Sequence, residues 1–323
     1  MSFSANGEPS GTSQGVATDL TSTGTTTTRM KSRDMALLIG VAMLWGFNFV
    51  PIRWALDAVP PFALAATRFT FAALPMVFFV RRPSAPIRLI VAYGLLIGVG
   101  QFGVLFLAIS MGMTAGLASL LAQTQVFFTI GLAALLLRDR ATVQQLAGAL
   151  VAGLGIVLLI YERVDAGATA SLATLLMVVA SAFFWGIANV IARHVGRRYK
   201  TDGFNLVVWS SLASPIPLAI ASFVLEGGTK PVTDLLNAGW LAFASIAFIV
   251  IGATLWGFAI WNGLLRKYTA AAVTPFALLV PIAGLGSAAL LLGEQLTVIE
   301  IAAGLTILLG LAIAVVPRPR RRC

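Results

Sequence analysis

One arginine lies inside an apolar segment and is the strongest candidate for a functional charge. Arg68 is the only charged residue of the apolar stretch 62–80. An ionised group deep in a bilayer costs roughly 2.5 to 3.5 kcal/mol, and such groups are commonly functional. The planar guanidinium can hold a carboxylate by two hydrogen bonds, which makes Arg68 a candidate for binding an anionic substrate or for a gate contact. The alternative is a structural role, in which the side chain extends toward the surface or bonds carbonyl groups of a neighbouring helix.

Two pairs of Trp and Asn could present both a ring and an amide to a small molecule. Trp45 and Asn48 are three residues apart, and Trp185 and Asn189 are four apart, so each pair shares one face of a helix. Indole and amide groups together can contact the apolar and polar parts of a metabolite. The alternative is helix packing with a polar tie, worth about 0.6 to 2 kcal/mol in membranes.

Three glutamines lie near the middles of long apolar segments. Gln101 falls in the segment 89–110, and Gln123 and Gln125 fall in the segment 115–137. Lipid cannot hydrogen bond to an amide, so each must be satisfied by protein, water or substrate. Two residues correspond to about 200° around a helix. This spacing predicts that Gln123 and Gln125 cannot both face one cavity, and that one of them ties helices together.

Other candidates have structural interpretations that compete with a role in binding. Trp209 and Trp256 could complete the aromatic wall of a substrate site, although tryptophan also fills space between packed helices. Arg53 lies one helical turn before Asp57. That spacing predicts an ion pair at the membrane interface rather than a role in the site.

The sequence lacks the patterns of metal, nucleotide and covalent chemistry. It has one histidine, His194, and one cysteine, Cys323, so it offers no metal-binding spacing and no intrachain disulfide. The glycine pattern at residues 98–103 matches a dinucleotide fingerprint, but it lies inside an apolar segment, where close helix packing explains it. No Asp or Glu falls near the middle of an apolar segment. We therefore expect no cofactor, no metal and no enzyme activity.

The elements that must position the candidate residues are apolar helices. Of 323 residues, 59% are hydrophobic and 11% are charged, whereas soluble domains have about 45 to 50% and about 25%. Ten apolar segments are each expected to cross about 30 Å of hydrocarbon. They cover residues 35–56, 62–80, 89–110, 115–137, 143–160, 171–192, 204–225, 239–265, 271–292 and 299–316. The sequence therefore predicts an all-α integral membrane protein with ten transmembrane helices.

The basic residues test this count independently. If the N-terminus is cytoplasmic, 18 of the 22 Lys and Arg fall on the cytoplasmic side, and only Arg163 and Lys230 fall in outer loops. This asymmetry follows the positive-inside rule and predicts that both termini are cytoplasmic. The net charge of +10, which in a soluble chain would suggest nucleic acid, is explained by this distribution. We expect a lipid bilayer and a small-molecule substrate as partners, and no nucleic acid.

An internal repeat divides the chain into two halves. Residues 133–137, 142–143 and 154–155 recur at a constant offset of 155. Because five spans per half is an odd number, the second half must enter the membrane from the opposite side, which predicts two inverted five-helix repeats. The expected organisation is a disordered N-terminal segment at 1–33, repeats at 34–163 and 164–317, and a basic cytoplasmic tail at 318–323.

Several stretches of the sequence resemble a known family of membrane transporters. The most specific are residues 112–120, 123–130 and 275–294, together with 45–49 and 68–69. From the first apolar segment to the last, the chain resembles the EamA-type branch of the drug/metabolite transporter superfamily. Within that branch it looks most like bacterial exporters of O-acetylserine and cysteine. The resemblance implies ten spans in two inverted halves and a place in the bacterial inner membrane, but superfamily members carry many kinds of cargo.

These observations predict a secondary transporter that exports small amino-acid metabolites by alternating access. Proton- and sodium-coupled carriers usually place an acid at the membrane midplane, so its absence predicts facilitated transport or exchange. A broad-specificity drug or metabolite efflux carrier is the alternative, which a larger aromatic cavity would favour. A membrane enzyme is disfavoured because one histidine and scattered acids do not form a catalytic cluster.

Overall fold

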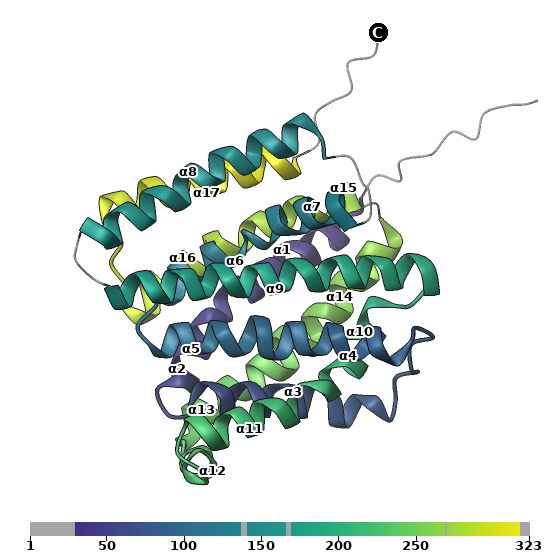
Figure 1. The fold of residues 1–323 in the computed structure, drawn as a ribbon. Coiled ribbons are helices and arrows are strands. Elements are labelled where there is room, and N and C mark those ends of the chain that lie inside the picture. The colour runs from purple at the N-terminus through teal and green to yellow at the C-terminus, as the bar shows by residue number, and fades with distance from the viewer. Residues whose placement is uncertain (1–29, 137–140, 166–168, 269, 317–323) are drawn as a thin grey trace, which may run out of the picture.

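The computed structural model describes residues 30–136, 141–165, 169–268 and 270–316. All regular secondary structure in these ranges is helical, and most of the helices run side by side across the molecule (Figure 1). The predicted all-α fold is confirmed. The expected disordered segment falls mainly on residues 1–29, and the expected basic tail on 318–323, so both lie outside the described residues.

Three of the helical segments in the first half are interrupted by short breaks or a change of helix type. At the first break, Pro51 has no N–H to donate to the carbonyl of Phe47, and Asn48 lies between two helices. The elements in chain order are α1 (Ser32–Phe47), α2 (Phe49–Leu56), α3 (Pro61–Val77), α4 (Ile87–Leu95), η1 (Leu96–Gly103), α5 (Val104–Ser110), α6 (Ala115–Ala122), α7 (Gln125–Leu136) and α8 (Val143–Asp165).

The second half contains a matching interruption. The elements are α9 (Thr169–Tyr199), α10 (Gly203–Ser210), η2 (Ser211–Ala213), α11 (Pro215–Leu225), α12 (Lys230–Leu236), α13 (Gly239–Ala247), η3 (Phe248–Trp256), α14 (Gly257–Lys267), α15 (Ala270–Val273), η4 (Thr274–Leu278), α16 (Leu279–Leu292) and α17 (Val298–Val315). Both η1 and η3 are π-helices. Each lies within the third apolar segment of its half, and π-helical turns are frequent at functional sites.

Nine helical units among the described residues are apolar enough and long enough, at 18 to 29 residues, to cross a membrane. They coincide with nine of the ten predicted segments. The remaining segment, predicted at 62–80, forms the 17-residue helix α3. At 1.5 Å per residue, α3 is about 25 Å long, somewhat less than a full hydrocarbon thickness. The protein is thus a multi-span membrane protein, and the count of ten crossings stays a prediction.

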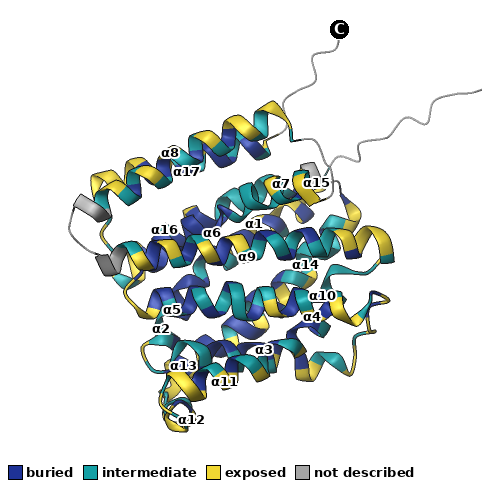
Figure 2. Cartoon of the chain, viewed as in Figure 1, coloured by how far each residue is buried: buried dark blue, intermediate teal, exposed yellow. Residues whose placement is uncertain are grey.

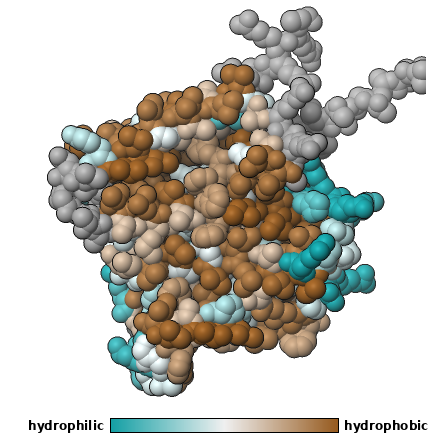
Figure 3. Space-filling model, in the orientation of Figure 1, coloured by the Kyte–Doolittle hydropathy of each residue, from teal (hydrophilic) through white to brown (hydrophobic). Residues whose placement is uncertain are grey.

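Large apolar side chains cover the outside of the bundle. Phe78, Phe79, Val143 and Leu290 are each more than 80% exposed. Exposed residues follow the outward faces of the helices (Figure 2), and hydrophobic side chains dominate the face seen in Figure 3, with hydrophilic ones gathered toward its ends. Soluble proteins rarely expose contiguous apolar surface of this extent. The outer surface is therefore suited to contact with lipid.

Close helix contacts account for the glycine pattern at residues 98–103. A Cβ atom on Gly98 would lie 1.9 Å from the Oγ atom of Ser214. The same Ser214 hydroxyl donates a hydrogen bond of 2.9 Å to the carbonyl of Gly94. The pattern lies in η1, inside a span, and the prediction that its glycines serve helix packing is confirmed.

Candidate functional site

A cavity of about 690 Å³ lies inside the bundle, with walls from both halves of the chain. This volume is within the range of small-molecule sites. Among the described residues that line it, Arg68 is the only charged side chain. The wall also carries seven amide side chains, those of Asn48, Gln101, Gln123, Gln125, Gln145, Asn189 and Asn262. The cavity is therefore rich in uncharged hydrogen-bonding groups around a single positive charge.

The structure brings eight of the ten predicted site residues to this cavity. They are Trp45, Asn48, Arg68, Gln101, Gln123, Gln125, Trp185 and Asn189. Trp209 and Trp256 do not line it. The indole N–H of Trp209 donates a 2.9 Å hydrogen bond to the carbonyl of Val80, and Trp256 is 53% exposed at the end of η3.

Arg68 is buried in the cavity wall without a full set of partners. Its side chain is 3% exposed, and its Nε and Nη1 atoms have no hydrogen-bond acceptor. The guanidinium carbon lies 3.6 Å from the ring centroid of Phe102 and 5.7 Å from that of Phe69. These cation–π contacts favour the charge and hold the guanidinium in place, but they leave N–H donors free. A buried donor without an acceptor costs about 1 to 3 kcal/mol, and more for a charged group.

Asn48 contributes a second unpartnered polar atom. The break between α1 and α2 places its buried side chain in the cavity wall, and its Oδ1 atom has no hydrogen-bond donor. One turn earlier, the indole N–H of Trp45 donates a 2.8 Å hydrogen bond to the carbonyl of Ala253 in η3. The ring of Trp45 also packs against Phe258 and Trp261, with centroid distances of 5.1 Å to each. The predicted Trp and Asn pair thus presents a fixed ring beside a free amide oxygen.

Gln123 and Gln125 both line the cavity, so the prediction that they could not face one cavity was wrong. The prediction assumed an unbroken helix. In the structure α6 ends at Ala122 and α7 begins at Gln125, with a turn between them. Within the turn, the Thr124 hydroxyl donates a 2.6 Å hydrogen bond to the carbonyl of Leu121. Such side-chain bonds compete with helical geometry.

Asn189 forms a polar cluster with two residues of α7. Its Nδ2 atom donates to the Oε1 atom of Gln125 at 2.6 Å and to the Oγ1 atom of Thr129 at 3.1 Å. All three residues line the cavity. The cluster therefore ties the two halves together and also forms part of the cavity wall, whereas the sequence had offered these roles as alternatives.

Sequence reasoning missed several aromatic residues of the site. Phe102 lies under Arg68, and Phe258 and Trp261 pack on Trp45. Phe102 directly follows Gln101, and both are in η1. Phe258 and Trp261 are three residues apart, so the sequence alone places them on one helix face. Without a tertiary structure, however, nothing distinguished these rings from ordinary packing.

The cavity extends to one end of the bundle. Its wall includes Gln145, Thr201 and Thr274, which lie at or near helix ends. We call this the basic end, because its described helix ends and loops carry Arg81, Arg82, Arg88, Arg193, Arg197, Arg198, Lys200, Arg266 and Lys267. The opposite end is formed by the segments 57–60, 111–114, 226–238 and 293–297, and none of their residues lines the cavity.

At the opposite end, Arg53 forms the ion pair expected from its spacing. Its Nη2 atom lies 3.0 Å from the Oδ1 atom of Asp57, and both side chains are exposed. Arg53 also donates a 3.4 Å hydrogen bond to the carbonyl of Ile109. The predicted structural ion pair is confirmed.

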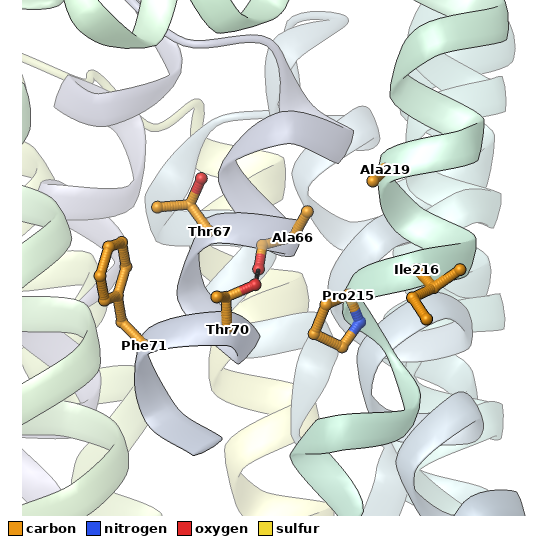
Figure 4. Close-up of a pocket in the computed structure, with 7 residues that line it drawn as sticks. All are labelled: Ala66, Thr67, Thr70, Phe71, Pro215, Ile216 and Ala219. Atoms are coloured by element: carbon orange, nitrogen blue, oxygen red, sulfur yellow. Dashed lines mark hydrogen bonds between the residues drawn. The ribbon is translucent and has the colours of Figure 1, made fainter. Parts of the chain in front are cut away.

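A second hollow of about 300 Å³ lies between α3 and α11, lined by the residues drawn in Figure 4. The hydroxyl groups among its described lining residues, those of Thr67 and Thr70, donate 2.8 Å bonds to the carbonyls of Ala63 and Ala66 in their own helix. Phe71 and Ile216 are exposed. This hollow offers no free polar group to a ligand and is part of the apolar surface.

Across the described residues no group of three or more His, Cys, Asp or Glu side chains is arranged to hold a metal ion.

A bundle of membrane-crossing helices around a polar internal cavity is the architecture of a solute carrier. The EamA-like transporter family model matches the chain twice, at residues 33–161 and 172–316. The chain therefore belongs to the EamA-like transporter family, within the drug/metabolite transporter superfamily.

The names of several similar proteins support a role in export. The "Probable amino-acid metabolite efflux pump" of Salmonella typhimurium (strain LT2) is 39% identical over 287 residues, covering 88% of this chain and 96% of the relative. The protein of the same name from Escherichia coli (strain K12) has the same identity and coverage. A "Probable terminal-alkyne amino-acid exporter" of Streptantibioticus cattleyicolor is 27% identical over 264 residues, covering 79% of this chain and 86% of the relative. A crystal structure that covers 88% of this chain and 96% of its own shares the fold, with a TM-score of 0.59 and 23% identity.

Proposed function

We propose that this transporter exports small amino-acid metabolites across a bacterial plasma membrane and that Arg68 binds the substrate carboxylate. The observation that carries the proposal is the buried guanidinium with free N–H donors in the cavity wall. A carboxylate is the natural partner for such a group, because Arg can hold it by two charge-assisted hydrogen bonds. The free oxygen of Asn48 adds an acceptor for a substrate N–H or O–H group.

The charge of the cavity supports an anionic or zwitterionic cargo. Arg68 contributes a full positive charge, and no Asp or Glu is among the described lining residues. A substrate with a net positive charge would meet an unpaired like charge in a low-dielectric space, which is strongly unfavourable. The names of the two 39% identical relatives are consistent with amino-acid metabolites as the cargo.

For the transport cycle we propose alternating access between two inverted five-helix repeats, with both termini cytoplasmic. The two family matches and the π-helices η1 and η3 at related places in each half support the repeat. The concentration of Lys and Arg at the basic end supports a cytoplasmic position for that end. Reporter fusions after Arg88 and after Lys230 test the orientation: the first should report the cytoplasm and the second the outside.

We further propose that transport is facilitated or proceeds by exchange. A carboxylate that could bind a proton or sodium ion is missing from the described cavity wall. A substrate gradient alone should therefore drive flux into proteoliposomes, with little response to an imposed pH or sodium gradient. Concentrative flux driven by a proton gradient would contradict this part of the proposal.

A broad drug or metabolite efflux carrier is the second candidate function. The rings of Trp45, Trp185, Phe258 and Trp261 in the cavity wall favour it, since such surfaces accept varied apolar compounds.

The deciding experiment is transport into proteoliposomes with four radiolabelled probe classes: neutral amino-acid metabolites, a methyl ester of one of them, a cationic amino acid and an apolar cationic drug. We expect flux of the first class, at least about tenfold above the ester and the cations, which corresponds to about 1.4 kcal/mol. Preferential flux of the apolar cation would instead establish the drug carrier.

A further inference from the structure

One glutamate of the second half caps a helix of the first half at the opposite end of the bundle. The backbone N–H groups of Ala115 and Gly116 donate to the Oε1 and Oε2 atoms of Glu294, at 2.7 and 2.9 Å. These are the first two residues of α6. N–H groups at a helix start have no acceptor within the helix and lie at the positive end of its dipole, so a carboxylate is strongly preferred there.

A second glutamate makes the same kind of contact. Glu226, after the end of α11, accepts hydrogen bonds from the N–H groups of Phe62 at 2.7 Å and Ala63 at 3.2 Å. These N–H groups belong to the first turn of α3, which begins at Pro61. Both contacts join a carboxylate of the second half to a helix start of the first. We call them the two carboxylate clasps.

The local backbone is shaped to make the Glu294 clasp. Gly293 has a φ of +66°, in the left-handed region, and ends α16 just before Glu294. On the other side, a Cβ atom on Gly116 would lie 3.1 Å from the Oε2 atom of Glu294 and 3.1 Å from Leu285. A side chain at Gly116 would therefore crowd the carboxylate and push it a few tenths of an ångström from the helix start.

An alternative cap for α6 is already in place. Thr114 precedes the helix in an extended conformation, as N-cap residues do, and threonine is a preferred N-cap residue. Its hydroxyl makes no capping hydrogen bond here, and its Oγ1 atom is buried without a partner. If Glu294 withdrew, Thr114 could accept a hydrogen bond from its own helix. The α6 start can thus be capped in two ways, which lowers the cost of breaking the clasp.

The same short helix connects this clasp to the cavity. All eight residues of α6 are buried, and the helix is about 10 Å long from Ala115 to Ala122. Ala122 and the next residue, Gln123, line the cavity. A shift of the helix at the cavity would therefore act on the Glu294 clasp at its other end.

We propose that Glu226 and Glu294 are the gate residues of the opposite end, and that both clasps must break for the cavity to open there. The inference rests on the alternating access proposed above, because it concerns the state that the cycle must reach next. The cavity already extends to the basic end, and the clasps join the halves at the end that it does not reach. Weakening the clasps should increase the population open at the opposite end.

Cysteine labelling tests the gate without any substrate. Cys323 is the only cysteine, so Cys323→Ser gives a background without thiols. Ser119→Cys then places a thiol of similar size one turn inward from Gly116, at a site that is 0% exposed and that does not line the cavity. An impermeant maleimide is applied separately to right-side-out and inside-out vesicles, and the folded yield is measured by size-exclusion chromatography.

We expect Glu226→Gln combined with Glu294→Gln to raise the labelling rate from the opposite end at least about tenfold, equivalent to about 1.4 kcal/mol. Gly116→Ala, which keeps both acids but obstructs one clasp, should change labelling in the same direction by a smaller factor. Asp57→Asn is the matched control, because this acid at the same end forms an ion pair with Arg53 of its own helical segment, and it should leave the rate unchanged.

An unchanged labelling rate in the well-folded double variant, or an equal rise with Asp57→Asn, would overturn the gate. If the double variant does not fold, Gly116→Ala provides the test. An unchanged labelling rate in that variant also overturns the gate. The proposed cargo is judged separately, since increased labelling with no amino-acid flux would retain the gate and reject the substrate. Amino-acid flux with no increase in labelling would retain the substrate and reject the gate.

Discussion

Four side chains show how the cavity differs from the opposite end: Arg68 and Asn48 have polar atoms that lack hydrogen-bond partners, whereas the clasp glutamates have partners. In the cavity, the Nε and Nη1 atoms of Arg68 and the Oδ1 atom of Asn48 are buried without partners. At the opposite end, both oxygens of Glu226 and both oxygens of Glu294 accept hydrogen bonds from helix starts. Unmet hydrogen bonds reduce stability until a ligand supplies the missing partner, whereas satisfied ones stabilise one arrangement of the helices. The comparison indicates that the cavity is a binding region and that the opposite end stabilises one conformation of the protein.

The largest expected effect is on transport when the cavity charge is removed. Arg68→Ala should lower kcat/KM for a carboxylate substrate at least about 100-fold, or about 2.7 kcal/mol, because the carboxylate loses its counter-charge. Arg68→Lys keeps the charge without the planar fork and should fall between this variant and the wild type. The measurement is initial flux in proteoliposomes at equal amounts of folded protein.

Arg53→Ala is the control for this experiment. Arg53 forms an exposed pair with Asp57, and such pairs contribute about 0 to 1 kcal/mol. Its flux should remain near that of the wild type. Unaltered substrate affinity in well-folded Arg68→Ala would remove the binding role and leave Arg68 as a structural residue.

A second contrast concerns stability, where the two regions should respond with opposite signs. Glu294→Ala loses two charge-assisted bonds and should lower the free energy of unfolding by about 2 to 3 kcal/mol. Arg68→Met removes an incompletely paired buried charge while keeping a long apolar chain against Phe102, so stability should be unchanged or higher by about 1 to 3 kcal/mol. Thermal unfolding of the purified variants in detergent measures both. A marked loss of stability in Arg68→Met would show that the two regions do not differ as described.

Two tryptophans test whether the cavity wall marks the substrate path. Trp261 lines it and packs on Trp45, whereas Trp256 does not line it and is 53% exposed. Trp261→Ala should reduce flux about tenfold, since the half-buried ring packs on Trp45 and truncating such an aromatic side chain can cost more than about 1 kcal/mol. Trp256→Ala should leave flux unchanged. Equal effects of the two changes would mean that the cavity wall does not mark the substrate path.

The smallest expected effect is the coupling between Gln125 and Asn189. Because their side chains share a 2.6 Å hydrogen bond in the cavity wall, a double-mutant cycle of alanine variants should give about 0.6 to 1.7 kcal/mol. The control cycle pairs Gln125 with Asn262, whose amide bonds Phe258 in its own helix, and should be additive. Thermal unfolding supplies the free energies, and equal coupling in both cycles would contradict a specific tie.

Most of the span positions could be predicted from the sequence, because hydropathy depends on consecutive residues. Nine of the ten predicted segments correspond to membrane-length helices. Interruptions within the helices were harder to predict. Pro51 marked the break beside Asn48, but the turn at Gln123 had no proline or glycine to signal it. That missed turn made the predicted orientation of Gln123 and Gln125 wrong.

The candidate site was only partly predictable. Polar residues in apolar segments are rare enough to stand out, and this rarity selected Arg68, Asn48 and Gln101, which all line the cavity. Aromatic residues are common in membrane helices, so the same reasoning could not separate Trp261 from Trp256. Deciding between them required knowing which helix faces meet around a shared space.

The sequence by itself determined that the chain is a multi-span membrane protein with one charge deep in a span, because composition and local patterning decide what a bilayer accepts. Only the tertiary structure decided which polar groups are free and which are satisfied. Glu226 and Glu294 look in the sequence like ordinary loop acids after apolar helices. Their partners are 164 and 178 residues away, at Phe62 and Gly116. A hydrogen bond depends on positions in space, and folding alone brings those helix starts within reach of the two carboxylates.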